Sequence, residues 1–404
     1  MLRFALLIGP TLLACSPRPA VQTLADRGKV VVISIDGFRW DYLDRPAAAR
    51  LRDIAATGVR VERLVPAFPT KTFPNLYTIA TGLYPEHHGI VANTMVDSSI
   101  DRRFLAGDTV AVSDPRWWGG EPIWVTAIRQ GRRAATMFWP GSEAAIGGIR
   151  PTYWRRFDPR LPGEDRFRQL LAWIDLPPDS TPQFLTLYLN ELDFVAHKAG
   201  PESPRVDSAL AHVDRLIGGF VDSLAARGLA DRTNLIVLSD HGVVDSPVDR
   251  MIYLDDYLDS SSVVIHDWNP VAAIDPRPGR EAEVYSRLAG ANPHLAVYRK
   301  AEVPARFRFS SHPRIAPIVA IADEGWTITS RGRPPATDLG NHGYDHELPS
   351  MGGILIATGP AFQAGIRVPA FQNVHLYELM AHLLDLTPAP NDGRLDSVRA
   401  LLRR

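Results

Sequence analysis

Residues 29–37 read KVVVISIDG, and this stretch decides the fold that the sequence predicts. The run from 29 to 35 is apolar and β-branched without alternation, which is typical of a strand buried on both faces of a parallel sheet. Asp36 follows this run, so we expect its carboxylate at the carboxyl edge of the sheet, where α/β proteins place their ligand sites. An aspartate that only caps the following turn is the alternative.

Buried strands and amphipathic helices alternate along most of the chain. Further inner strands are predicted at 184–189 (FLTLYL) and 234–238 (NLIVL), with a long amphipathic helix at 206–224 between them. Other strands are predicted at 59–64, 134–139 and 353–358, and other helices at 47–56, 72–83, 122–130, 165–174 and 374–384. This alternation predicts an α/β fold with a doubly wound, mostly parallel sheet.

The pattern changes between about residue 245 and residue 340. Short, proline-flanked segments at 262–266, 296–298 and 318–321 are interrupted by a helix at 281–288. We expect a small α+β lobe inserted here, beside the site of a domain that spans residues 28–404.

Residues 1–15 (MLRFALLIGPTLLAC) have the pattern of an export signal. Arg3 precedes an apolar run at 4–14 that is too short to span a bilayer. Cys15, the only cysteine, resembles the lipidated residue of a bacterial lipoprotein, and it has no second cysteine to pair with. We expect a periplasmic or otherwise extracytoplasmic protein anchored through Cys15, with residues 16–27 as a tether. A plain secretory signal, removed together with Cys15, is the alternative.

Charge composition indicates small ligands rather than polymers. The chain of 404 residues has a formal net charge of −1, and no basic stretch is dense enough to follow a nucleic-acid backbone. We therefore expect nucleotides or other small phosphodiesters as partners and no requirement for polymeric nucleic acid. Membrane contact is expected only through the N-terminal anchor, and we expect a monomer.

Seven scattered residues carry the candidate chemistry, and nearly all follow predicted strand ends. Such ends meet in one crevice of a parallel α/β sheet. Six nitrogen or oxygen ligands and one hydroxyl suit two Zn²⁺ ions, each with three protein ligands and an open position. Two metals beside a hydroxyl nucleophile suit phosphoryl transfer. The residues are Asp36, Thr72, Asp193, His197, Asp240, His241 and His342.

The spacing within this set has functional and ordinary interpretations. Asp193 and His197 are four residues apart, so on a helix both can reach one ion, although a surface pair has the same spacing. Asp240 and His241 project together from a strand end, where His241 could instead bond a neighbouring loop. His342 lies in a glycine-flanked loop that allows close approach to a ligand, and a loop histidine without a partner is its alternative.

Thr72 is the candidate nucleophile. It stands at the start of the helix predicted at 72–83, in PTKTFPN. Backbone N–H groups and the helix dipole at that end favour an anion such as a phosphate. Threonine is also an ordinary N-cap residue, and Thr70 competes with Thr72 for that role.

Together these residues resemble the nucleotide pyrophosphatase/phosphodiesterase family of the alkaline phosphatase superfamily. Residues 69–93 (PTKTFPNLYTIATGLYPEHHGIVAN) resemble its nucleophile motif, and LDFVAHKAGP, LSDHG and GNHGYD resemble its metal motifs. The resemblance covers about residues 31–362 and implies an alkaline phosphatase-like fold. It also implies Thr72 as the nucleophile and Asn93 as a residue that helps to hold the phosphoryl oxygens.

The same resemblance implies how the ligands are shared between two zinc ions. Asp193, His197 and His342 would hold one zinc. Asp36, Asp240, His241 and the Thr72 oxygen would hold the other. Phe73 and Tyr153 would sandwich the nucleoside base, with Trp139 of the WPGS stretch among the substrate-binding residues. The implied reaction releases nucleoside 5′-monophosphates through a covalent threonine intermediate.

Three other functions stay open on sequence alone. The same site could cleave a lysophospholipid headgroup, in the manner of a phospholipase C. It could be a phosphomonoesterase, although no arginine stands beside Thr72 to bind a dianionic phosphate. A catalytically idle zinc-binding lipoprotein is the third alternative.

Overall fold

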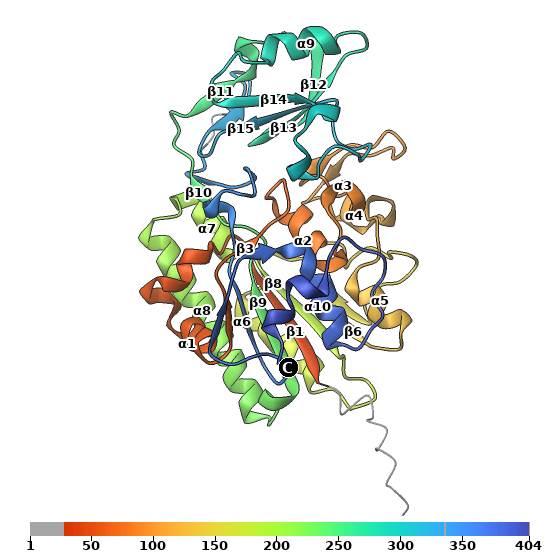
Figure 1. The fold of residues 1–404 in the computed structure, drawn as a ribbon, viewed down its shortest axis with the longest axis vertical. Helices are drawn as coiled ribbons and strands as arrows, with labels where there is room; N and C mark the ends of the chain where they lie inside the picture. The colour runs from red at the N-terminus through yellow and green to blue at the C-terminus, as the bar shows by residue number, and fades with distance from the viewer. Residues whose placement is uncertain (1–27, 335–336, 404) are drawn as a thin grey trace, which may run out of the picture.

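A computed structural model describes residues 28–334 and 337–403, which form a large α/β unit with a smaller lobe above it (Figure 1). The large unit is built on a sheet with strand order β19-β2-β18-β9-β1-β8-β6-β7. The strands are β1 Lys29–Ile35, β2 Val59–Val61, β6 Ala134–Met137, β7 Tyr153–Arg155, β8 Phe184–Leu189, β9 Thr233–Leu238, β18 Leu355–Thr358 and β19 Ile366–Val368.

Strand direction confirms the predicted doubly wound, mostly parallel sheet. The central strand β1 pairs in parallel with β8 on one side and β9 on the other, and β6 continues in parallel beyond β8. Every residue of β8 and β9 is buried, as the unbroken apolar runs predicted. Only β18 runs antiparallel to its neighbours β9 and β2.

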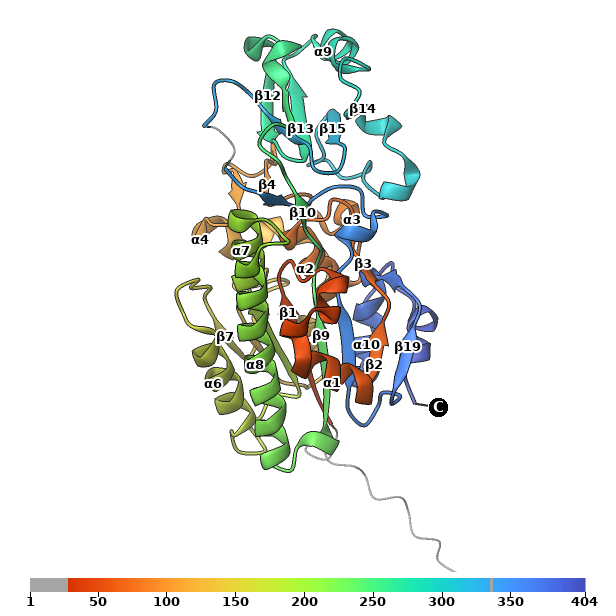
Figure 2. The same ribbon diagram turned by 90° about the vertical axis from the view of Figure 1, so that its left-hand side faces the viewer.

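Helices cover both faces of this sheet (Figures 1 and 2). On one face lie α1 Ala49–Thr57, α6 Gly163–Ile174 and the long α8 Pro204–Ala226. On the other lie α2 Thr72–Thr81, α5 Ile123–Arg129 and α10 Leu376–Leu383. The sequence explains α8: Ser203 caps its first turn, Pro204 opens it, and its apolar stripe is buried against the sheet. These layers leave the carboxyl edge of the parallel strands facing the lobe.

The lobe has its own sheet and its own apolar cluster. Its antiparallel strands are ordered β12-β13-β15-β14, with bounds Val263–Asp267, Val271–Pro276, Ile318–Ala322 and Leu295–Arg299. Helix α9 Glu281–Leu288 covers the sheet, and Ile274, Val284, Leu288 and Ile318 pack between them. The sequence prediction missed β13, which lies in the middle of this sheet.

Two short strands connect the lobe to the large unit. β10 Val244–Asp245 carries the chain upward and pairs antiparallel with β17 Gly340–Asn341, which carries it back. A second connection comes from the lobe-side residue Arg314, which donates to the carbonyls of Gly89 and Trp117 and pairs with Asp97. The lobe is therefore held directly above the carboxyl edge of the main sheet.

The predicted signal segment at 1–15 and tether at 16–27 lie outside the described residues. Among the helices of the described residues, none combines the length and the apolar character that a bilayer span needs.

Candidate metal centre and nucleotide pocket

Asp36, Asp240 and His241 form the first candidate metal group, called here the inner trio. Asp36 follows β1, and Asp240 and His241 follow β9, so two neighbouring parallel strands deliver all three side chains. The His241 Nε2 atom lies 3.2 Å from Asp36 Oδ1 and 3.3 Å from Asp240 Oδ2. All three residues are buried. The predicted meeting of strand ends therefore occurs.

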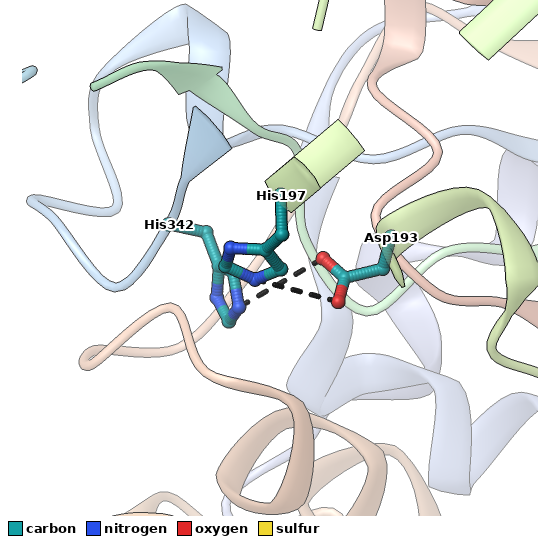
Figure 3. A group of neighbouring side chains, drawn as sticks. All are labelled: Asp193, His197 and His342. Carbon is teal, nitrogen blue, oxygen red and sulfur yellow. Dashed lines mark ion pairs between the residues drawn. The ribbon is translucent and has the colours of Figure 1, made fainter. Parts of the chain in front are cut away.

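Asp193, His197 and His342 form the second group, the outer trio (Figure 3). Asp193 and His197 lie one turn apart on α7 Glu191–Ala199, as their spacing predicted, and His342 follows β17. His197 Nε2 is 3.4 Å from Asp193 Oδ2, and His342 Nε2 is 3.9 Å from Asp193 Oδ1. The rings of His241 and His342 stack with centroids 3.6 Å apart, so the two trios adjoin.

The three histidines share one hydrogen-bond arrangement. Each Nδ1 faces a backbone carbonyl: Gly340 for His197 at 2.7 Å, Gly242 for His241 at 3.0 Å, and Thr70 for His342 at 2.8 Å. A carbonyl can only accept, so each Nδ1 donates and each Nε2 keeps its lone pair. A metal-binding imidazole is held in this way by its second nitrogen.

The carboxylates show a complementary arrangement. Among the described residues, one buried oxygen of each acid has no hydrogen-bond partner: Asp36 Oδ1, Asp193 Oδ1 and Asp240 Oδ2. An unsatisfied buried oxygen costs free energy unless a ligand occupies it. The inner trio offers two carboxylates and one imidazole nitrogen, and the outer trio offers one carboxylate and two imidazole nitrogens. Both ligand sets suit zinc. The residues present therefore fit two metal ions.

Burial shifts the pKa of the three carboxylates and of two histidines in these trios. It raises the pKa of Asp36 well above 3.8, and the charges of Asp240 and Asp193 add to the effect. Burial also raises the pKa of Asp240 and of Asp193. The pKa of His241 is lowered by burial, and that of His342 falls well below 6.5 because burial acts together with the neighbouring imidazoles. A bound dication would attract the three carboxylates and offset the repulsion between their negative charges.

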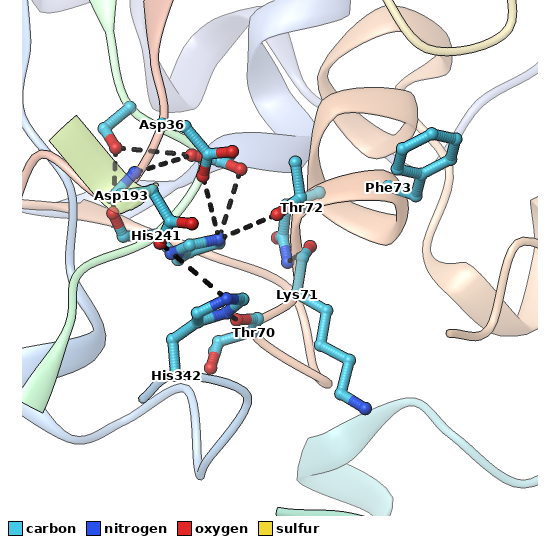
Figure 4. Close-up of polar contacts among 12 residues, drawn as sticks. Asp36, Thr70, Lys71, Thr72, Phe73, Asp193, His241 and His342 are labelled. Atoms are coloured by element: carbon cyan, nitrogen blue, oxygen red, sulfur yellow. Dashed lines mark hydrogen bonds and ion pairs between the residues drawn. The ribbon is translucent and has the colours of Figure 1, made fainter. Parts of the chain in front are cut away.

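Thr72 is the first residue of α2 and faces the inner trio (Figure 4). Its Oγ1 lies 3.2 Å from His241 Nε2. The N-cap position belongs to Lys71, and no side chain caps this helix, so neither Thr72 nor Thr70 has the capping role that was their alternative. Thr70 instead accepts a bond from Gly343 N and holds the His342 loop. The Thr72 hydroxyl is thus not used as a helix cap, and it lies at a helix N-terminus beside the inner trio.

Asn93 lies beside the same helix start. Its Oδ1 accepts a hydrogen bond of 3.1 Å from the backbone N–H of Phe73. This bond fixes the side-chain amide next to the residue that follows Thr72. Asn93 therefore lies close to Thr72, the candidate nucleophile.

A cavity of about 300 Å³ reaches Phe73, the residue that follows Thr72. Phe73 and Trp139 line it, as the sequence predicted, and the Trp139 indole donates to the Leu76 carbonyl. Phe157 forms another wall and is 39% exposed, which makes it the rim of the cavity. A cavity of this size with aromatic walls can take a heterocyclic base.

The structure does not bring Tyr153 to this cavity. Its ring stacks on Trp173 at a centroid distance of 6.3 Å, and its hydroxyl donates to the Ser180 carbonyl. The reason is strand direction: Tyr153 begins β7, whereas Phe157 follows its carboxyl end, the end that faces the site. Phe157, four residues later, therefore forms the second aromatic wall in place of Tyr153.

The sequence analysis also missed Tyr188, which lines the cavity and bonds Asp36. Tyr188 lies in FLTLYL, where an aromatic residue is expected to be a core residue. Its position one residue before the strand end was the signal that could have found it.

A parallel α/β sheet with two carboxylate–histidine trios and a helix-terminal threonine at its carboxyl edge defines a hydrolase of the alkaline phosphatase-like class. Comparison with known proteins identifies the family. Residues 30–345 match the family described as type I phosphodiesterase / nucleotide pyrophosphatase. The chain belongs to this family, which confirms the predicted resemblance, the fold and the class of enzyme.

Individual relatives agree with this assignment. The chain is 41% identical over 379 residues to the mouse (Mus musculus) bis(5′-adenosyl)-triphosphatase enpp4, covering 93% of this chain and 81% of that protein. It is 37% identical to human (Homo sapiens) ectonucleotide pyrophosphatase/phosphodiesterase family member 5, covering 98% and 83%. A structure of the murine member 5, an inactive T72A variant in complex with AMP, matches with a TM-score of 0.90 and 39% identity, covering 93% of this chain and all of that one.

Proposed function

We propose that this enzyme hydrolyses nucleotide phosphodiester or pyrophosphate bonds with two zinc ions and releases nucleoside 5′-monophosphates. The observation that carries the proposal is the Thr72 hydroxyl at the start of α2, which lies 3.2 Å from His241 Nε2 of the inner trio. The murine relative supports it, because that protein is inactive as a threonine-to-alanine variant and binds AMP.

The inner trio and the outer trio would each hold one zinc ion. When bound, the ions would supply Lewis acidity and offset the negative charge of the phosphate. The protein's own part is to place the substrate: Phe73 and Phe157 would hold the base, and the N-terminal N–H groups of α2 and the Asn93 amide would orient the phosphoryl oxygens.

The reaction would proceed in two displacements at phosphorus. In the first, the Thr72 Oγ1–phosphorus bond forms, the bond to the leaving group breaks, and the hydroxyl proton is lost to solvent or to the leaving group. In the second, a water oxygen bonds to phosphorus, the threonine ester breaks, and Thr72 regains a proton. The intermediate is a covalent nucleotidyl-threonine, and the product is a nucleoside 5′-monophosphate.

Substitution of Thr72 tests this proposal. Thr72→Ala should lose turnover of nitrophenyl thymidine monophosphate while it keeps wild-type zinc content, because the six acid and histidine ligands are intact. Thr57→Ala, at the exposed end of α1, is the matched control and should keep full turnover. Mass spectrometry of quenched wild type should show a nucleotide adduct on Thr72. Full activity of Thr72→Ala would show that Thr72 is not the nucleophile and would contradict the proposed mechanism.

A base-free phosphodiester tests the nucleotide preference. Phe157→Ala should raise KM for nitrophenyl thymidine monophosphate by about 5- to 100-fold, which is the contribution of one base-stacking contact. The same change should leave bis(nitrophenyl) phosphate unaffected. An equal loss on both substrates would show that the cavity binds no base and would favour another phosphodiester, such as a lysophospholipid.

We propose further that the chain is exported and anchored through a lipidated Cys15, that it is monomeric, and that residues 28–404 form the catalytic domain with a lobe inserted at about 245–340. Metabolic labelling with a radioactive fatty acid tests the anchor: wild type should carry label and fractionate with membranes, and Cys15→Ser should do neither. Label on both proteins would contradict the assignment.

A further inference from the structure

Tyr188 connects the aromatic cavity to the inner trio. It is a residue of β8, 8% exposed, and its ring is part of the cavity wall, with its centroid 6.0 Å from that of Phe157. Its phenolic hydroxyl donates a hydrogen bond to Asp36 Oδ2. One side chain thus touches both the surface that would hold a base and a carboxylate that would hold zinc.

The hydrogen bond distinguishes the two oxygens of Asp36. Oδ2 accepts from Tyr188, whereas Oδ1 has no hydrogen-bond partner among the described residues and lies 3.2 Å from His241 Nε2. The backbone restrains the same carboxylate, since Asp36 N donates to the carbonyl of Leu189, the residue after Tyr188. Without the phenol, the carboxylate could rotate and its second oxygen would be buried without a partner.

We infer that Tyr188 is a positioning residue that turns the free oxygen of Asp36 toward the inner trio. The inference rests on the proposed function for the identity of the trio as a zinc site. Tyr188 acts through Asp36 and not by contact with the reacting phosphate. Its ring and its hydroxyl have separable roles, because the ring forms the wall and the hydroxyl holds the ligand.

Two conservative changes separate these roles. Tyr188→Phe keeps the ring and removes only the hydrogen bond. Tyr153→Phe is the matched control. It removes a tyrosine hydroxyl from the same sheet, one that donates to the Ser180 carbonyl and contacts neither trio. Tyr188→Met removes both ring and hydroxyl at similar volume, and it keeps the test usable if one variant folds poorly.

Zinc affinity is the primary readout. It is measured by chelator competition in a His197→Ala background, where the inner trio keeps all three of its ligands and the outer trio does not. Tyr188→Phe should weaken this affinity about 10- to 100-fold, the usual effect of losing the partner that orients a ligand. Tyr153→Phe should leave it unchanged. An unchanged affinity in Tyr188→Phe would overturn the inference.

Kinetics in the otherwise wild-type chain give the second readout. At subsaturating zinc, Tyr188→Phe should lower kcat equally for nitrophenyl thymidine monophosphate and for bis(nitrophenyl) phosphate, with KM changed less than about twofold because the wall is intact. Tyr188→Met should add a rise in KM for the nucleotide alone. A change confined to the nucleotide KM in Tyr188→Phe would mean that the hydroxyl serves the base and not Asp36.

The outcomes separate this inference from the proposed function. If the wild-type chain cleaves no nucleotide but Tyr188→Phe still loses zinc affinity, the positioning role holds and the proposed substrate is wrong. If nucleotides are cleaved and zinc affinity is insensitive to Tyr188, the proposed function holds and the positioning role is wrong.

Discussion

The inner and outer trios have the same number of ligands but are built in different ways. The inner trio lies within the sheet edge, with side-chain exposures of 4% for Asp36 and 0% for Asp240 and His241. In the outer trio, Asp193 is 15% exposed, His197 22% and His342 9%. The inner ligands come from two adjacent strands, whereas the outer ligands come from a helix and from the segment that returns from the lobe.

The geometry of the two trios therefore depends on different parts of the structure. The geometry of the inner trio follows from the pairing of β1 with β9, which is part of the hydrophobic core. The geometry of the outer trio depends also on β17, whose partner β10 leads into the lobe. The outer trio is the more exposed to water, and it is the one that changes in the lobe can disturb.

The largest difference between the trios is expected from removing one histidine from each. His241→Ala removes a fully buried ring that donates to the Gly242 carbonyl and leaves a cavity, so we expect a loss of about 2–5 kcal/mol in the free energy of unfolding. His197→Ala lies where water can replace the ring, and its loss should be about 1 kcal/mol or less. Thermal and denaturant unfolding of the metal-free variants measure this. Equal losses would mean that burial does not distinguish the trios.

Gly37 tests the spacing between the trios. Its φ is +66°, and a Cβ there would lie 2.9 Å from Asp193 Oδ1 and 3.1 Å from Asp193 Cα. Gly37→Ala should therefore displace Asp193 and weaken zinc binding at the outer trio about tenfold or more, with a smaller effect on the inner trio. A chelator titration of both sites is the measurement. Gly107→Ala is the control, because a Cβ at Gly107 meets nothing within 4 Å.

The pH dependence of the metal-free protein tests the inner carboxylates. Burial raises the pKa of Asp36 above 3.8, so the folded protein keeps a proton that the unfolded chain has released. Stability should then fall as pH rises above 3.8 through the raised pKa, by at most about 1.4 kcal/mol per pH unit for one group. Zinc requires the ionised form, so the stabilisation by zinc should grow over the same range.

Comparison with Asp36→Asn isolates this effect, since buried histidines act in both proteins. In chelator, the variant should gain stability relative to wild type as pH rises, measured by urea unfolding at several pH values. The exposed Asp249→Asn should show no such gain. A parallel pH profile for Asp36→Asn and wild type would contradict the raised pKa.

The smallest effect is expected at the exposed rim of the outer trio. Asp338 pairs with Lys198 at 2.6 Å and lies 3.9 Å from His197 Nδ1, with its side chain 47% exposed. Asp338→Asn should weaken outer-trio zinc binding only a few-fold, and added salt should abolish the difference, because exposed charges are screened. A chelator titration at low and high salt measures it. A loss that persists at high salt would mean that Asp338 acts on His197 directly and not as a screened surface charge.

Much of the site could be predicted from local sequence because its chemistry follows strand ends. Asp36, Asp240 and His241 follow unbroken apolar runs, and such runs identify a parallel sheet and its carboxyl edge. Asp193 and His197 lie four residues apart in one nine-residue helix, a spacing that places both side chains on the same face. In each case the signal and the ligand lie within a few residues of each other.

The second aromatic wall could not be predicted in the same way. β7 is only three residues long, and YWR has no periodicity that marks a strand or its direction. The prediction therefore selected Tyr153, at the beginning of the strand, while Phe157 beyond its carboxyl end reaches the cavity. Tyr188 was missed because a buried strand residue and a ligand-positioning residue look the same in sequence.

The sequence by itself determined the class of fold, the candidate ligands and the family, because hydrophobic periodicity and residue type are local properties of the chain. Only the tertiary structure decided which ligands meet, which nitrogen of each histidine is free, and which oxygen of Asp36 is held by Tyr188. These contacts join strands, helices and the segment that connects to the lobe. They bring together residues up to 272 positions apart in the sequence. Their geometry comes from the pairing of neighbouring strands and from the placement of α7 and β17 beside them, which no short stretch of sequence encodes.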